Sequence, residues 1–272
     1  MAVVHVTNWA EFKSAVAVSG NTVIVDNNID ANGSYVTSPI TISCTTIQGG
    51  GHTIYNIYGN TNIFNGASNT RHVVEDLNFA NVDTSAASSG GSIFRGTGSS
   101  TYIDVYRCNI QGNLKLVASG YTTFTSCAIV ISGGGIHYGF SNMAAGGPHF
   151  TQCYIDLGEA FQITGTAFAV YTYFRNCYFK GTWKLTQNTF FMGNSTPAQS
   201  YNNVFNVHLT ADSAQTLSFF SSNGGTDISI YNTDRINGNI TMAGLRNCLI
   251  GLDDAKMKNA TEIAAVGFPI IT

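Results

Sequence analysis

Apolar and polar residues alternate in short segments along most of the chain, and one short frame returns repeatedly. The frame has an apolar or aromatic residue, two polar positions, a Cys (once Asn203 instead) and, two positions later, another apolar residue. It is read at FRNCYFKG (174–181), VYRCNIQG (105–112), FTSCAIVIS (124–132), FTQCYIDLG (150–158), SYNNVFNV (200–207) and LRNCLIGL (245–252). A frame repeated every few tens of residues predicts stacked structural units.

The N-terminal segment has a different pattern. Asn8 and Glu11 have the spacing of a capping box, in which each side chain bonds a free backbone amide at the start of a helix. Trp9, Phe12, Ala15 and Val16 then fall on one face of that helix, which we expect at about residues 8–18. Extended apolar segments follow at 21–30 and 40–57, the latter bent at three consecutive glycines.

This order of elements resembles the opening of the pectate-lyase-like, single-stranded right-handed parallel β-helices. The resemblance implies an all-β solenoid, here of about nine or ten coils, with the helix covering the open end of the first coil. Trp9 and Phe12 are the residues expected to close that end. We therefore expect an N-terminal cap at 1–21, a parallel β-helix at 22–255 and a C-terminal tail or cap at 256–272 that is a candidate subunit contact.

Two residue types recur at fixed positions of the frame. The cysteines are predicted to be free, buried thiols stacked in a ladder, because equivalent positions of adjacent coils lie about 4.8 Å apart and disulfides need closer Cβ atoms. The ladder residues are Cys108, Cys127, Cys153 and Cys177. Asparagine suits left-handed corners because its side chain can bond its own backbone. The predicted corner residues are Asn176, Asn202, Asn232 and Asn247.

Composition narrows the classes of function. Only 10% of the residues are charged and the net charge is −3, which gives no basic surface for nucleic acid. No run of 18 apolar residues exists, so no membrane span is expected, and no signal peptide is visible. No CxxC, HxH or HExxH occurs, and neither a metal site nor a cofactor is expected.

Candidate catalytic residues rest on resemblance. Asn232-Thr-Asp234 followed by Asp253-Asp254 is similar to the NTD and DD motifs of polygalacturonase-type β-helix hydrolases, which implies paired carboxylates on adjacent coils. The later motifs of those enzymes, GxHG and RIK, are absent. A lyase-type site would need a calcium-binding carboxylate cluster and an arginine base, for which Glu75, Asp76 and Arg107 are candidates.

Candidate binding residues lie on the rungs and in the long loops. A column of outward tyrosines at one frame position is either a sugar-stacking platform or a subunit interface. Its members are Tyr106, Tyr201 and Tyr231. His137 and Tyr138, in the long loop at 132–149, are either an acid–base or sugar-binding pair, or loop residues without such a role.

The function predicted first is that of a non-enzymatic bacteriophage virion protein, a spike, fibre or capsid-decoration subunit that presents a carbohydrate- or host-surface-binding β-helix. Its expected partners are two further copies in a homotrimer, other virion proteins and a host-surface polysaccharide. The expected location is the virion, assembled in the bacterial cytoplasm, or else outside the cell. The alternatives are a polysaccharide lyase or glycoside hydrolase of the same fold and a secreted bacterial adhesin.

Overall fold

The structure is a computed structural model of the 272-residue chain. The backbone is described for residues 1–86, 91–96, 100–114, 116–119, 121–132, 136–137, 148–158, 161–163, 173–185, 189–190, 203–211, 215–218, 226–230, 240–243, 245–251 and 270–271. Side chains are described for residues 1–86, 91–96, 100–114, 121–132, 148–158, 174–181 and 203.

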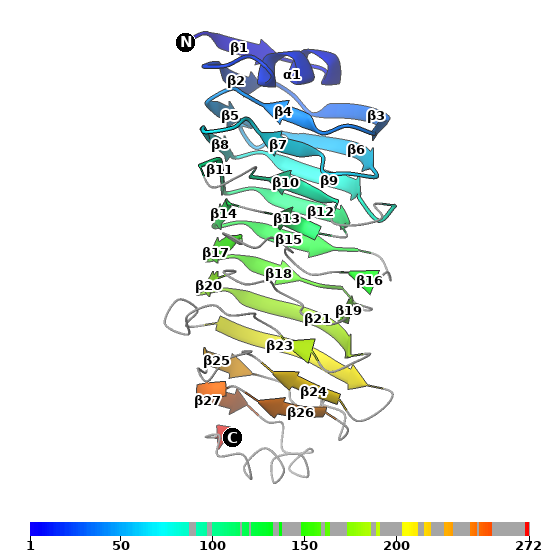
Figure 1. The fold of residues 1–272 in the computed structure, drawn as a ribbon, viewed down its shortest axis with the longest axis vertical. Coiled ribbons are helices and arrows are strands. Elements are labelled where there is room, and N and C mark those ends of the chain that lie inside the picture. Colours follow the sequence, from blue (N-terminus) through cyan, green and yellow to red (C-terminus); the bar gives the residue numbers. More distant parts are fainter. Residues whose placement is uncertain are drawn as a thin grey trace.

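The chain winds as a stack of coils into a rod, with the two termini at opposite ends (Figure 1). Over residues 22–119 each coil passes in turn through three sheets, called sheets A, B and C. The later coils continue in sheet B, with described strands of sheet A or of a further sheet, and every described strand pair is parallel. Because the strands of one sheet come from successive coils, backbone amides and carbonyls pair along the rod rather than within a coil. The predicted all-β parallel β-helix is confirmed.

The described strands have the following bounds. Sheet A contains β1 (Val3–Val6), β2 (Thr22–Val25), β5 (Thr46–Gln48), β8 (Arg71–Glu75), β11 (Tyr102–Tyr106), β14 (Thr122–Thr125), β17 (His149–Thr151) and β20 (Tyr173–Arg175). Sheet B contains β3 (Ile29–Val36), β6 (Thr53–Gly59), β9 (Asn78–Asp83), β12 (Asn109–Asn113), β15 (Ala128–Ile131), β16 (Ile136–His137), β18 (Tyr154–Asp156), β19 (Phe161–Ile163), β21 (Tyr178–Leu185), β23 (Asn203–Ala211), β25 (Thr226–Ile230), β27 (Leu245–Gly251) and β28 (Ile270–Ile271). Sheet C contains β4 (Ile40–Ile42), β7 (Phe64–Gly66), β10 (Ser92–Arg95) and β13 (Leu116–Ser119), and a further sheet contains β22 (Thr189–Phe190), β24 (Gln215–Ser218) and β26 (Ile240–Ala243).

Helix α1 (Trp9–Val16) covers the first coil. The Asn8 side chain accepts a hydrogen bond from the Glu11 amide (3.0 Å), as in a capping box. The Glu11 carboxylate reaches one residue further back than predicted, because it accepts from the amide (2.8 Å) and hydroxyl (3.0 Å) of Thr7. Trp9 and Phe12 are both buried and stack on each other, with 5.6 Å between ring centroids. Phe12 in turn contacts Phe64 of the coil below.

Strand β1 was not predicted. It adds to the end of sheet A beside β2, and the His5 ring bonds the Asp26 carboxylate (2.9 Å) at the end of this pair. The cap of the rod is therefore a helix and an edge strand together. The sequence did not identify β1 as a strand because four residues are too few for an alternation of apolar and polar positions to be recognised.

The core repeats the same residue on successive coils of sheet A. Phe124, Phe150 and Phe174 point inward from β14, β17 and β20, and their rings stack face to face. The centroid separations are 4.9 and 5.1 Å, which is close to the spacing of neighbouring strands. Fully buried rings of this kind contribute most of the apolar burial in such a coil.

The predicted glycine bend separates β5 from β6. Gly50 and Gly51 adopt the left-handed backbone region, with φ of 58° and 85°. Gly49 is needed for a different reason, because a Cβ atom there would lie 2.3 Å from the Asp76 carbonyl oxygen of the next coil.

Candidate functional site

From β8 onward, a sharp corner joins each described strand of sheet A to the following strand of sheet B. Its first residue has a left-handed backbone although none is glycine, and its second residue points into the core. The first residues are Asp76, Arg107, Ser126, Gln152 and Asn176, with φ of 52°, 51°, 55°, 54° and 53°. Because five consecutive coils repeat the conformation, the corner forms a straight outer column of side chains on the rod.

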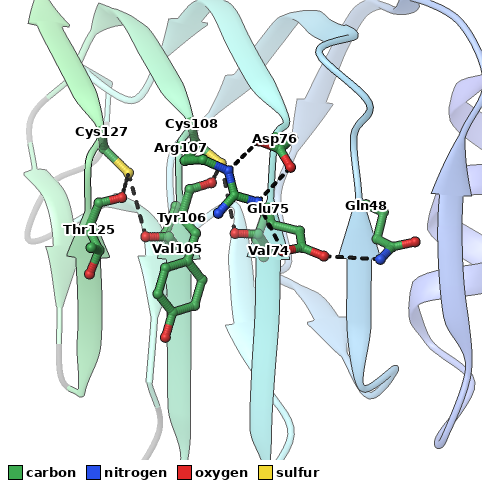
Figure 2. A network of polar contacts seen from close by, with 10 residues as sticks. All are labelled: Gln48, Val74, Glu75, Asp76, Val105, Tyr106, Arg107, Cys108, Thr125 and Cys127. Atoms are coloured by element: carbon green, nitrogen blue, oxygen red, sulfur yellow. Dashed lines mark hydrogen bonds and ion pairs between the residues drawn. The ribbon is translucent and has the colours of Figure 1, made fainter.

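The most connected polar cluster lies at this corner and is shown in Figure 2. Arg107 forms a two-pronged ion pair with Asp76 of the preceding coil, with Nε and Nη2 each 2.7 Å from a carboxylate oxygen. Nη2 also donates to Glu75 (3.2 Å), whose other oxygen accepts from Gln48 one coil further up (3.0 Å). Glu75, Asp76 and Arg107 were predicted as candidates for a lyase-type site, and in the structure they lie together on adjacent coils.

Electrostatics fixes the protonation states of this cluster. Hydrogen bonding to Arg107 lowers the pKa of Asp76, and the same contact raises the pKa of the Arg107 guanidinium. Asp76 is therefore a poorer proton acceptor than a free carboxylate, and Arg107 cannot lose a proton near neutral pH. The ion pair joins two neighbouring coils electrostatically.

A second cluster on the outer face of sheet A was not predicted. Asp104 of β11 is only 2% exposed, and its carboxylate is paired with the Arg71 guanidinium of β8. The Thr123 hydroxyl of β14 donates a further hydrogen bond to Asp104 (2.5 Å). Burial of a carboxylate is tolerated because each of its oxygens has a partner. The partners of Asp104 lie on two other strands, so no short sequence motif predicts the cluster.

Arg71 is at the same time part of an aromatic surface. Its guanidinium lies 5.5 Å from the Tyr102 ring centroid, and the pairing with Asp104 raises its pKa. Tyr102 also contacts Tyr121 of the next coil, with 5.1 Å between centroids. Because 65% of the Arg71 side chain is exposed, a charged group held in a fixed orientation lies beside two aromatic rings at the surface.

The predicted cysteine ladder lies on the inner side of the same corner. Cys108, Cys127, Cys153 and Cys177 are buried and free, and each thiol lies 3.5–3.8 Å from a carbonyl oxygen of the preceding coil. Hydrogen bonding between thiols of neighbouring coils, together with burial, raises the pKa of Cys108 and Cys153, so these two thiols stay protonated. Cys44 is also free and buried, but it lies at the corner between β4 and β5.

Asn203 takes the ladder position one coil below Cys177. Its side chain is buried, accepts from the Cys177 amide (3.0 Å) and donates to the Phe174 carbonyl (2.9 Å). A polar residue is accommodated in this column because both ends of its amide are bonded.

The remaining predicted residues are placed as follows. Tyr106 is half-buried at the end of β11, between Glu75 of β8 and Thr125 of β14 in register. His137 ends the short strand β16, inside the predicted loop. Asn247 lies within β27, where the register with β25 shifts, so its expected corner does not separate two strands there. Outside the described residues lie Tyr138, Tyr201, Asn202, Tyr231, Asn232, Asp234, Asp253 and Asp254.

Sheet B carries an outward aromatic pair that sequence reasoning missed. Tyr154 of β18 and Tyr178 of β21 stack with 5.8 Å between centroids and an angle of 6° between ring planes. Two residues further along the same strands, the Lys180 Nζ lies 3.7 Å from Oδ2 of Asp156. The two tyrosines follow Cys153 and Cys177 directly, so their alignment with the ladder is the signal that would have found them.

Two kinds of feature are absent from the described part of the chain. Within it, no group of three or more His, Cys, Asp or Glu side chains is arranged to hold a metal ion. Over the same residues, no helix is long and apolar enough to cross a membrane.

Comparison with known proteins gives one match. Residues 3–113 match the family model of a pectate lyase-like adhesive domain. No curated protein and no solved structure matches the chain. The matched segment covers the capping helix, the glycine bend and the coils that carry Arg71, Asp104 and Arg107. Together with the parallel coils that continue beyond residue 113, this match confirms the resemblance of the chain to the pectate-lyase-like superfamily.

Proposed function

We propose that this protein is an adhesive β-helix that binds carbohydrate without cleaving it. The observation that carries the proposal is the state of the Glu75, Asp76 and Arg107 cluster, the best-connected polar group on the described surface. Its arginine is held protonated and its aspartate is held ionised by their mutual contact. Catalysis of sugar cleavage needs a group that can give or take a proton near the working pH, and neither residue meets this requirement.

The outer face of sheet A offers a binding surface in place of a catalytic one. Tyr102, Tyr121 and Arg71 place two aromatic rings and a guanidinium side by side. Aromatic rings stack against the apolar faces of sugars, and a guanidinium donates hydrogen bonds to hydroxyl or carboxylate oxygens. Because Asp104, itself hydrogen-bonded by Thr123, holds this arginine in place, little side-chain freedom is lost on binding. The adhesive-domain match over residues 3–113 supports the same function.

We further propose that the protein is a bacteriophage spike, fibre or capsid-decoration subunit. It acts as a homotrimer that binds a host-surface polysaccharide, and the virion is assembled in the bacterial cytoplasm. Free, buried cysteines are consistent with assembly in a reducing compartment. Light scattering on the purified chain tests the assembly. A stable monomer at micromolar concentration would remove the trimer and weaken the virion assignment.

The adhesive function is tested by affinity electrophoresis in gels that contain polysaccharides, both neutral and acidic. We expect retardation of the wild-type chain by at least one polymer and weaker retardation of Tyr102→Ala. Parallel assays for reducing ends and for unsaturated products at 235 nm should stay at background. Release of products that Asp253→Asn abolishes would instead establish the enzymatic alternative. Absence of binding to every polymer would overturn the proposal.

A further inference from the structure

The outward row of sheet B that contains Tyr154 has a gap in its stack. Reading down the rod, the residues in register are Asn78, Asn109, Ala128, Tyr154 and Tyr178. Asn109 donates to Asn78 (2.9 Å), and Tyr154 stacks on Tyr178, so each neighbouring pair is filled. Between them Ala128 contributes a single methyl group.

This gap has the size of one six-membered ring. Neighbouring strands lie about 4.8 Å apart, so Asn109 and Tyr154, two strands apart, are separated by about 9.6 Å. A ring placed midway would lie about one strand spacing from the Asn109 side chain and from the Tyr154 ring. Tyr178 stacks on the other face of Tyr154 at a similar distance, with 5.8 Å between ring centroids. The Tyr154 side chain is 38% exposed, which agrees with a ring that is covered on only one side.

The rim of the gap is polar and carries little net charge. Gln111 on one side and Ser126 and Gln152 on the other are exposed side chains with hydrogen-bonding groups. The charged residues nearby are paired: Asp156 lies 3.7 Å from Lys180, and Arg107, which precedes Ser126 in the corner column, is paired with Asp76 and Glu75. The site therefore combines an aromatic face with several uncharged donors and acceptors, the arrangement that recognises the apolar face and hydroxyl edge of a sugar.

We propose that the gap over Ala128 is a binding subsite for one pyranose ring of a neutral polysaccharide, stacked on Tyr154 and hydrogen-bonded by the polar rim. The subsite lies on sheet B, apart from the Tyr102 surface on sheet A, and it rests on the proposed carbohydrate-binding function. A glycan that occupies it completes the aromatic column of the rod with a ring from outside the chain.

The test is affinity electrophoresis of the full chain in dextran, galactomannan and xyloglucan, with polygalacturonate as the acidic comparison. Ala128→Phe fills the gap with a ring, and Tyr154→Ala removes the stacking face. Each is expected to weaken binding to the retarding neutral polymer about tenfold or more, the loss of one good aromatic contact. Ala128→Ser keeps the gap open, and Tyr35→Ala removes an exposed tyrosine (54%) of the same sheet elsewhere. Both controls should bind as the wild type does.

The outcomes separate the subsite from the general function. If a neutral polymer retards the wild type and neither Ala128→Phe nor Tyr154→Ala changes this, the subsite is wrong while carbohydrate binding stands. Retardation by polygalacturonate alone would overturn the subsite and leave the adhesive function intact. No retardation by any polymer would overturn both. Circular dichroism confirms that each variant is folded, and Tyr154→Ala decides the matter should Ala128→Phe not fold.

Discussion

Two columns of residues run side by side along the corner between sheets A and B. They differ in burial, in backbone conformation and in how far the residue type varies from coil to coil. The inner column is Cys108, Cys127, Cys153 and Cys177, the same residue on each coil. The outer column, one residue earlier in each coil, is Arg107, Ser126, Gln152 and Asn176, a different residue on each coil. Neighbours in sequence are thus under opposite constraints.

The difference follows from what each column must satisfy. An inner residue has to fit a fixed space between coils and bond a carbonyl of the coil above, so one small apolar residue serves repeatedly. An outer residue has to tolerate a left-handed backbone, and its side chain is otherwise unconstrained. The fold is therefore encoded where residues repeat, and functional variation has room where they do not.

The largest expected effect is on the reactivity of the inner column. In a Cys248→Ser background the remaining thiols are the five buried ones, and burial raises the pKa of Cys44 to about 12. Ellman's reagent at pH 8 should modify these thiols at least about 10³-fold more slowly in the native protein than in guanidinium, since reaction requires unfolding. A thiol that reacts within seconds in the native protein would show that the ladder is open to solvent.

Removing one ring from the phenylalanine column comes next. Phe150 lies between Phe124 and Phe174 and is fully buried, so Phe150→Ala leaves a cavity between two coils. The free energy of unfolding, measured by urea denaturation, is expected to fall by about 3–5 kcal/mol. Phe150→Leu is the matched control with a smaller cavity, and a loss as large as that of alanine would mean that stacking rather than volume matters.

Replacing Asn203 with cysteine tests whether the inner column favours cysteine at every coil. Asn203→Ala leaves the Cys177 amide and the Phe174 carbonyl without this side chain as partner, which should cost about 2–3 kcal/mol. Asn203→Cys continues the ladder, and its thiol can bond the Phe174 carbonyl as Cys177 bonds Phe150. We expect the cysteine variant to lose less stability than the alanine variant. The reverse order, measured by urea denaturation, would show that the column does not favour cysteine at this coil.

The smallest effect is expected in the outer column. Asp76→Asn keeps a residue suited to the left-handed corner and removes the ion pair with Arg107, an exposed pair worth less than about 1 kcal/mol. The lowered pKa of Asp76 means that its contribution is present above the unfolded value of about 3.9 and is lost as pH falls through the folded value. The difference in stability between wild type and variant should therefore shrink below about pH 4. A difference that is constant between pH 3 and pH 7 would exclude this ion pair as its source.

The repeating interior explains how much the sequence predicts. The Cys frame identified the coils, and the spacing of Asn8, Trp9, Glu11 and Phe12 identified the cap, because both patterns are local. The left-handed corner was expected from asparagines, yet on four of the five coils another residue occupies it. An arginine there is unusual by local preference and is tolerated because Asp76 and Glu75 hold it.

Surface clusters were harder to predict because they depend on register. Asp104 finds its partners on the coils before and after its own, and Tyr154 and Tyr178 meet only when their coils are aligned to the residue. A shift of one residue would turn each of these side chains to the opposite face. The sequence shows where each coil has its repeated Cys motif. It does not show which outward residues of neighbouring coils lie in register, because that depends on the conformation of the loops between the motifs.

The capping helix has a consequence for the order in which the molecule forms. Contacts along the rod join residues separated by roughly one coil, as Cys153 and Cys177 are, and the capping helix precedes the coils in the sequence, so it leaves the ribosome before they do. Each new coil then has a finished template above it before the next is synthesised. The rod can therefore grow in one direction during translation, with its unpaired edge always at the most recently made coil.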